Sequence, residues 1–140
     1  MRYSLIVIFA LLAFVSANAE NKTVKPIKSW NGSLDDAKLS KLAPTTNYIN
    51  TAKEFDKLWE GWKLGKEKPK IDFTKQLVVL GTTSGGRGNL RITISEKGDL
   101  KVLFFGTRDF RPGFRYEIAI ISAEGIKSIN GKEYKRKEID

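Results

Sequence analysis

The spacing of apolar residues changes from a helical period to an alternating one at about residue 70, and this change limits the possible folds most strongly. Before it, four large apolar residues recur at the spacing of one helix face: Phe55, Leu58, Trp59 and Trp62. After it, apolar and polar residues alternate as they do in half-buried strands. A helical first third followed by strands predicts the α+β class.

The helix has clear sequence signals at its start and its end. Thr51 is suited to cap its first turn, and Glu54 follows three residues later, which is the capping-box spacing. Gly65 is placed to end it. The two tryptophans of the apolar stripe could stack on a ligand, but their helical spacing favours a core role.

Six segments after residue 75 are typical of strands. Residues 77–80 are apolar without interruption, which predicts a buried central strand. Asn130-Gly131 predicts a hairpin turn between the last two short strands. The expected strands are residues 76–82, 90–95, 100–105 and 115–122, and the hairpin 126–129 with 132–135. We therefore predict an antiparallel meander of about five or six strands, covered on one face by the amphipathic helix.

The first 19 residues are typical of a cleavable signal peptide. Arg2 precedes an uncharged apolar run from Leu5 to Val15, and Ala17 and Ala19 form a small-residue cleavage site. We expect cleavage after Ala19, no transmembrane anchor in the mature chain, and a secreted or periplasmic protein. Residues 20–44 then form a polar lead-in, with a turn at 30–32 and a short helix before Pro44, and residues 45–140 a single α+β domain.

The composition of the mature chain excludes several kinds of chemistry. The sequence contains no Cys and no His, which rules out disulfides, imidazole-dependent catalysis and the usual zinc, copper and haem ligands. We expect neither a cofactor nor a metal, and no enzyme activity. Removing residues 1–19 leaves 24 Lys and Arg against 16 Asp and Glu, a net charge of +8. A basic exported protein tends to meet anionic partners.

Arginine is concentrated in one part of the chain. Six arginines follow residue 19, and five of them lie between residues 87 and 115. Guanidinium groups bind carboxylates and phosphates in a bidentate manner, and phenylalanines interleave with them around the turn signal Pro112-Gly113. The candidate binding residues are Arg87, Arg91, Arg108, Phe110, Arg111, Phe114 and Arg115. The expected partner is a protein or an anionic polymer outside the cytoplasm, not a specific nucleic acid.

Plainer interpretations of this region remain open. The arginines could form only a basic surface, with Arg108 or Arg111 paired to Asp109 and Arg115 to Glu117. The glycine-rich segment 84–89 could cradle an anion on its N–H groups or be a flexible connection between strands. Asp109 and Glu117 could also act as the acid and base of a glycan hydrolase, although their spacing does not demand it.

Two stretches of the chain resemble a known family. The helix segment Lys53–Trp59 (KEFDKLW) and the strand entry Pro69–Val79 (PKIDFTKQLVV) are similar to bacterial exported domains of the PrcB C-terminal type. Gly85–Gly88 and Gly125–Gly131 extend the resemblance, which spans about residues 51–131. It implies an accessory subunit of an extracytoplasmic protease complex, with no catalytic residue.

A second resemblance supports a different binding role. Three loops are similar, in order, to those of chagasin-like cysteine-protease inhibitors: Pro44–Asn47, Gly86–Gly88 and Arg111–Phe114. This resemblance implies an all-β inhibitor, in which the helix at Thr51 has no place. We therefore expect an exported, non-enzymatic binding or accessory domain, with a protease inhibitor as the alternative and a glycan hydrolase as the further one.

Overall fold

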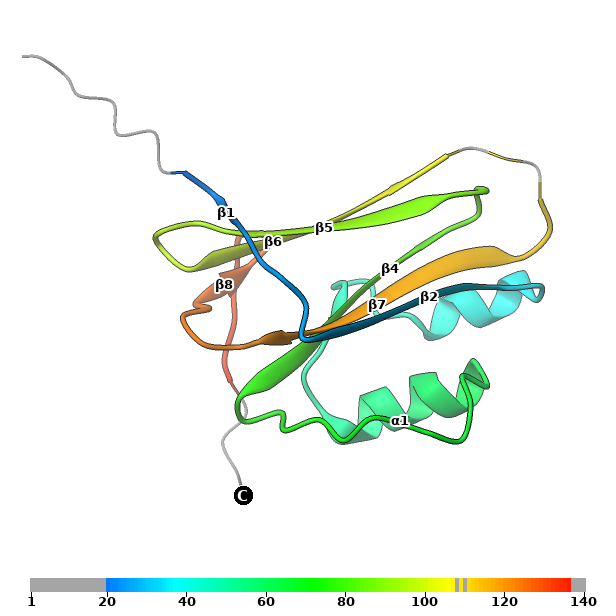
Figure 1. Cartoon of the computed structure of the whole chain (residues 1–140), viewed down its shortest axis with the longest axis horizontal. Helices are drawn as coiled ribbons and strands as arrows, with labels where there is room; N and C mark the ends of the chain where they lie inside the picture. The colour runs from blue at the N-terminus through cyan, green and yellow to red at the C-terminus, as the bar shows by residue number, and fades with distance from the viewer. Residues whose placement is uncertain (1–19, 108, 110, 137–140) are drawn as a thin grey trace, which may run out of the picture.

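The computed structural model describes residues 20–107, 109 and 111–136. The fold is of mixed α+β type and consists mostly of strands, arranged in a four-stranded and a five-stranded sheet with few helices. Figure 1 shows the helix α1 below the four-stranded sheet and the five-stranded sheet above it. The strands are β1 (Lys22–Thr23), β2 (Lys28–Leu34), β3 (Tyr48–Ile49), β4 (Gln76–Thr83), β5 (Gly88–Ile94), β6 (Asp99–Gly106), β7 (Phe114–Ser122), β8 (Ser128–Ile129) and β9 (Lys132–Glu133).

The helix α1 (Ala52–Gly61) begins where its sequence predicts. Thr51 is the N-cap, and its hydroxyl accepts a hydrogen bond from the Glu54 N–H at 3.3 Å. The helix ends earlier than predicted, because Lys63 adopts a left-handed φ of 53° before Gly65 is reached. The short helix predicted before Pro44 is a 3₁₀ helix, η1 (Ala37–Leu42).

The apolar stripe of α1 packs onto the four-stranded sheet. Its four residues belong to one core cluster with Val78 and Leu80 of β4 and with Ile118 of β7. Trp62 is fully buried, and its indole N–H donates to the Leu39 carbonyl oxygen at 2.8 Å, which joins α1 to η1. The tryptophans of the stripe are therefore core residues with satisfied polar atoms.

The four-stranded sheet, in the order β2-β7-β4-β3, is buried on both faces along β4 and β7. Val78 and Leu80 belong to the cluster beneath the helix, whereas Leu77 and Val79 belong to a second cluster. The second cluster also contains Leu100 and other inward residues of the five-stranded sheet. The four-stranded sheet is consequently the middle layer of the molecule.

The five-stranded sheet has the order β1-β5-β6-β8-β9. The hairpin predicted at Asn130-Gly131 is present between β8 and β9, and both turn residues have positive φ, 50° and 79°. Asn130 also accepts a hydrogen bond from the Val102 N–H at 2.9 Å. Asp99 accepts from the Ser128 hydroxyl at 2.6 Å and from the Gly131 N–H at 3.1 Å, so side chains secure this end of the sheet.

The prediction of a single meander is wrong. Strands β4 and β5 follow one another in the chain but lie in different sheets, and β4 pairs with β7 instead. The reason is that β4 and β7 each contain an apolar run, residues 77–80 and 118–121. Each run points apolar side chains to both faces of the sheet. One sheet covered by one helix would leave half of these side chains in water.

The turn predicted at residues 30–32 is also wrong. Strand β2 runs through these residues and pairs with β7 from Lys28↔Ile120 to Leu34↔Phe114. Gly32 lies under the ring of Tyr116, where a Cβ would clash, and Trp30 packs edge-on against Trp59 with ring centroids 5.7 Å apart. Contacts with residues distant in the chain therefore override a locally turn-like composition.

Residues 1–19, which the sequence predicts to be a signal peptide, lie outside the described residues. Within residues 20–107, 109 and 111–136, no helix combines the length and the apolar character that crossing a membrane requires.

Candidate functional site

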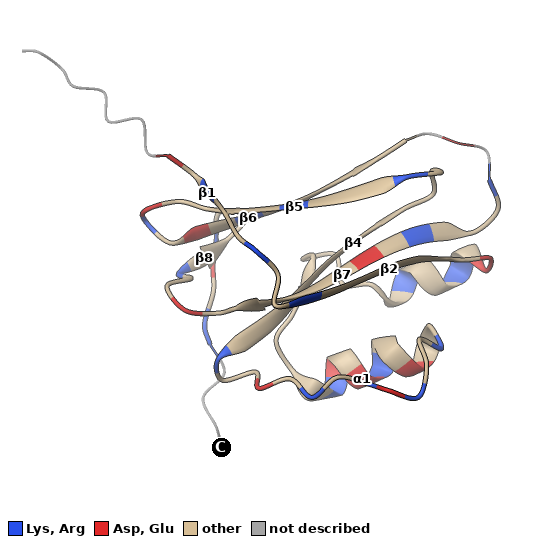
Figure 2. Ribbon diagram, viewed as in Figure 1, with Lys and Arg blue, Asp and Glu red and all other residues tan. Residues whose placement is uncertain are grey.

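Two adjoining hollows lie at the end of the molecule where β4 passes into β5 and β6 into β7. Their volumes are about 200 and 290 Å³, and Arg115 lines both. Figure 2 shows basic residues in the turn just before β5 and within β7 at this end. We call these residues the arginine end: Ser33, Asp35, Ser84, Gly85, Arg111, Pro112, Phe114 and Arg115 around the first hollow, and Asn31, Gly32, Gly86, Arg87, Gly88, Arg115 and Tyr116 around the second.

The glycine-rich segment at this end is packed and is not a free connection. A Cβ on Gly85 would overlap the carbonyl oxygen of Thr107, and one on Gly86 would overlap the Asp109 carboxylate. The Arg87 N–H donates to the Thr107 hydroxyl at 3.0 Å, and the Thr107 N–H donates to the Arg87 carbonyl at 2.9 Å. The glycines therefore let two loops touch, and this contact positions Arg87.

Arg115 lies on the side of β7 that faces the five-stranded sheet. It shares this side with Ala119 and Ile121, which belong to the core cluster between the two sheets. The neighbouring Glu117 does not pair with it. Its carboxylate instead accepts a hydrogen bond from the Leu90 N–H of β5 at 2.9 Å. Among the described residues, neither Arg87 nor Arg115 forms an ion pair.

The two hollows differ in charge. Asp35 and Arg111 both line the first, and the Arg111 Nε lies 4.0 Å from the Asp109 carboxylate, a solvent-exposed pair of the kind that contributes little. The second is lined by Arg87 and Arg115, and none of the described residues around it is acidic. Burial raises the pKa of Tyr116, which also lines the second hollow, so its hydroxyl stays protonated and able to donate.

The structure does not bring all the predicted binding residues together. Phe114 was predicted to contact a partner and does border the first hollow, but it is only 4% exposed and packs against Trp62 with ring centroids 5.3 Å apart. It shares the helix-facing side of β7 with Ile118, which explains its burial. Arg91 lies on the opposite face of β5 from the core residue Ile92, away from both hollows. Arg108 and Phe110 lie outside the described residues.

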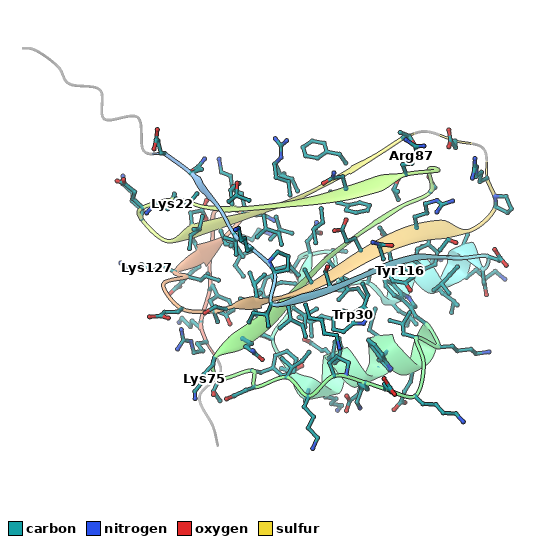
Figure 3. The ribbon with its side chains drawn as sticks, viewed as in Figure 1. Lys22, Trp30, Lys75, Arg87, Tyr116 and Lys127 are labelled. Atoms are coloured by element: carbon teal, nitrogen blue, oxygen red, sulfur yellow. The ribbon has the colours of Figure 1, made fainter. Side chains whose placement is uncertain are left out.

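Several lining residues were missed by the sequence analysis. Asn31, Gly32, Ser33 and Asp35 come from β2 and its end, and Figure 3 shows Arg87 and Tyr116 at the same end of the molecule. No local pattern places β2 here, because its partner β7 lies about 80 residues further along the chain. Successive side chains of a strand point to opposite faces, so the sequence of β7 could have shown that Phe114 and Arg115 lie on different faces of the sheet.

The residues of the alternative functions lie at separate places. Glu117 lines a third hollow with residues of β1 and β5, while the Asp109 carboxylate packs beside Gly86. Of the three loops that resemble those of protease inhibitors, Pro44–Asn47 lines neither hollow of the arginine end. No group of three or more acidic residues that could hold a metal ion occurs among the described residues.

Comparisons of the chain with family models, with curated proteins and with solved structures give no significant match.

Proposed function

We propose that this protein is an exported, non-enzymatic binding domain that holds an anionic group of its partner at the arginine end. The observation that carries the proposal is the second hollow, which Arg87 and Arg115 both line and which, in the part of the chain that the structure describes, has no acidic residue in its lining. Two guanidinium groups beside one hollow form a field that a carboxylate, sulfate or phosphate would neutralise.

The size of the hollow limits what it can hold. A volume of about 290 Å³ suits one small charged group and is at the lower end of the range for drug-sized ligands. The bound group therefore belongs to a larger molecule, such as an acidic protein side chain or a charged polymer. The neutral hydroxyl of Tyr116 and the amide of Asn31 can donate further hydrogen bonds to it.

The partner is proposed to lie outside the cytoplasm, because the first 19 residues have the pattern of a signal peptide. The resemblance to PrcB C-terminal domains supports an accessory role beside an extracytoplasmic protease. The net charge of +8 after cleavage adds a long-range attraction to such anionic partners.

The proposal is tested by the double substitution Arg87→Ala/Arg115→Ala. We expect it to weaken binding to poly-glutamate or dextran sulfate by tenfold or more, measured by calorimetry at low salt, since charge-assisted bidentate bonds are lost. Its free energy of unfolding should change by less than about 0.5 kcal/mol, because neither arginine has a described ion-pair partner.

The matched control is Lys53→Ala/Lys57→Ala, which removes the same charge from the exposed side of α1. It should retain most of the affinity. An equal loss in both double variants would mean that net charge alone binds the polymer, and the site would be refuted.

A further inference from the structure

The outer face of the five-stranded sheet carries exposed apolar side chains. Along β6, Leu100 and Val102 are buried, whereas Leu103 and Phe105 are 45% and 54% exposed. These two lie on the face turned away from the four-stranded sheet, since successive side chains of a strand alternate. Adjacent exposed apolar side chains on one face mark an interaction site when polar residues surround them.

Basic residues flank this apolar pair. The register of β5 with β6 places Arg91 opposite Leu103 and Thr93 opposite Lys101. The Arg91 guanidinium lies over the Phe105 ring, 5.7 Å from its centroid. We call this surface the outer patch, which comprises Asn89, Arg91, Lys101, Leu103 and Phe105.

The outer patch contains no acidic residue. Other positions of the same sheet do carry acids, but these are engaged near the β8–β9 hairpin. Asp99 accepts two hydrogen bonds there, and Glu133 lies 4.0 Å from the Lys135 amino group. Apolar and cationic groups are thus gathered at one part of the face, and acids at another.

We propose that the outer patch binds the surface of a membrane that contains anionic phospholipid. Leu103 and Phe105 would enter the boundary between headgroups and acyl chains, and Arg91 and Lys101 would lie at the phosphates. Binding at such an interface adds the burial of a few apolar side chains to the attraction of nearby cations, and it needs no matched shape.

A protein partner fits the patch less well. The area of two exposed apolar side chains is much smaller than the roughly 800 Å² per partner that a standard protein interface buries. Strand pairing through the edge of β6 is also restricted. Strand β8 covers this edge at Asp99 and Leu100, and the Asn130 side chain occupies the N–H of Val102. The edge that remains is only a few residues long.

Vesicle sedimentation tests the proposal. The protein is exported and processed in a bacterial host before purification, and its N-terminus is identified by intact-mass spectrometry. We expect binding to vesicles of phosphatidylglycerol and phosphatidylcholine, and little binding to phosphatidylcholine alone. Leu103→Ser/Phe105→Ser should lower the partition coefficient by about tenfold or more, because the inserted apolar area is lost. Ile27→Ser is the matched control, since Ile27 is 59% exposed but lies outside both sheets, and it should bind as the parent does.

The cationic half of the patch is tested separately. Arg91→Gln/Lys101→Gln should weaken binding about 25-fold at low salt, because each cation near the surface contributes about fivefold. Lys53→Gln/Lys57→Gln removes the same charge from α1, below the other sheet, and should have a much smaller effect.

Three outcomes would overturn the proposal. The first is no binding of the parent protein to anionic vesicles. The second is undiminished vesicle binding by Leu103→Ser/Phe105→Ser, which would show that net charge alone accounts for the binding. The third is a dimer in sedimentation that this variant disrupts while vesicle binding is unchanged, which would assign the patch to a second copy of the chain. Arg87→Ala/Arg115→Ala should still bind vesicles, so this inference and the proposed function fail independently.

Discussion

The two ends of the sandwich use their polar groups in opposite ways. At the hairpin end, beside β8 and β9, the Asp99 carboxylate accepts from Ser128 and Gly131, and the Asn130 amide oxygen accepts from Val102. At the arginine end, the loops are joined through backbone groups and small hydroxyls, and Arg87 and Arg115 have no described ion-pair partner.

This difference separates residues that stabilise the fold from residues that are available to a ligand. Side chains at the hairpin end satisfy backbone groups that would otherwise be left without a partner, so replacing them should reduce stability. At the arginine end the loops meet through glycine, so stability there depends on the small size of these residues, while charged residues line the hollows. The substitutions below test that separation.

The largest effect is expected from Gly85→Ala at the arginine end. Its new methyl group would overlap the Thr107 carbonyl oxygen, and backbone cannot move aside as a flexible side chain can. We expect a loss of about 3 kcal/mol in the free energy of unfolding, measured in urea. Ser84→Ala, at the exposed neighbouring position, should be nearly neutral. A Gly85→Ala protein as stable as the parent would show that the two loops are not packed as described.

A smaller loss is expected at the hairpin end from Asn130→Ala. This substitution removes the acceptor for the Val102 N–H and places alanine at a φ of 50°, which together should cost about 2 kcal/mol. Asn130→Gly tolerates the positive φ and loses only the acceptor, so it should cost about half as much. Equal losses in the two variants would contradict the contribution of backbone conformation.

The smallest effect concerns acid pH and Asp99. The Ser128 hydroxyl and then the Gly131 N–H hold the pKa of this carboxyl below its usual value. The stabilisation is therefore present above the unfolded-state pKa of about 3.9 and is lost as the pH falls through the lower folded-state pKa. In urea titrations from pH 6 to pH 2, the midpoint of the parent should fall further than that of Asp99→Asn. Parallel curves would contradict the assignment.

The types of the main elements and the β8–β9 hairpin could be predicted from the sequence, but the pairing of strands that lie far apart in the chain could not. The stripe around Trp59 and the alternation around Ile92 report local periodicity, and both segments form the expected kind of element. Pairing depends on contacts between distant residues, which periodicity does not encode. Even so, the unbroken apolar run at 77–80 required cover on both faces, and that requirement was sufficient to reject a single sheet under one helix.

The candidate site was predicted in part, for a related reason. The concentration of arginine identified Arg87, Arg111 and Arg115, which the structure gathers at one end. Closeness in the sequence does not specify which face of a sheet a residue occupies. Arg91 and Phe114 were therefore grouped with these arginines, although Arg91 lies on the outer face and Phe114 in the core. The contribution of β2 required its pairing with β7, and no local pattern shows that.

The pairing of β2 with β7 also has a consequence for the order of folding. Trp30 pairs with Ile118, about 90 residues later, so the middle layer cannot close until β7 has left the ribosome. Such high contact order is associated with folding times on the order of milliseconds to seconds. Until these strands pair, the middle layer is unfolded, and an unfolded chain is the form that proteases cleave most readily.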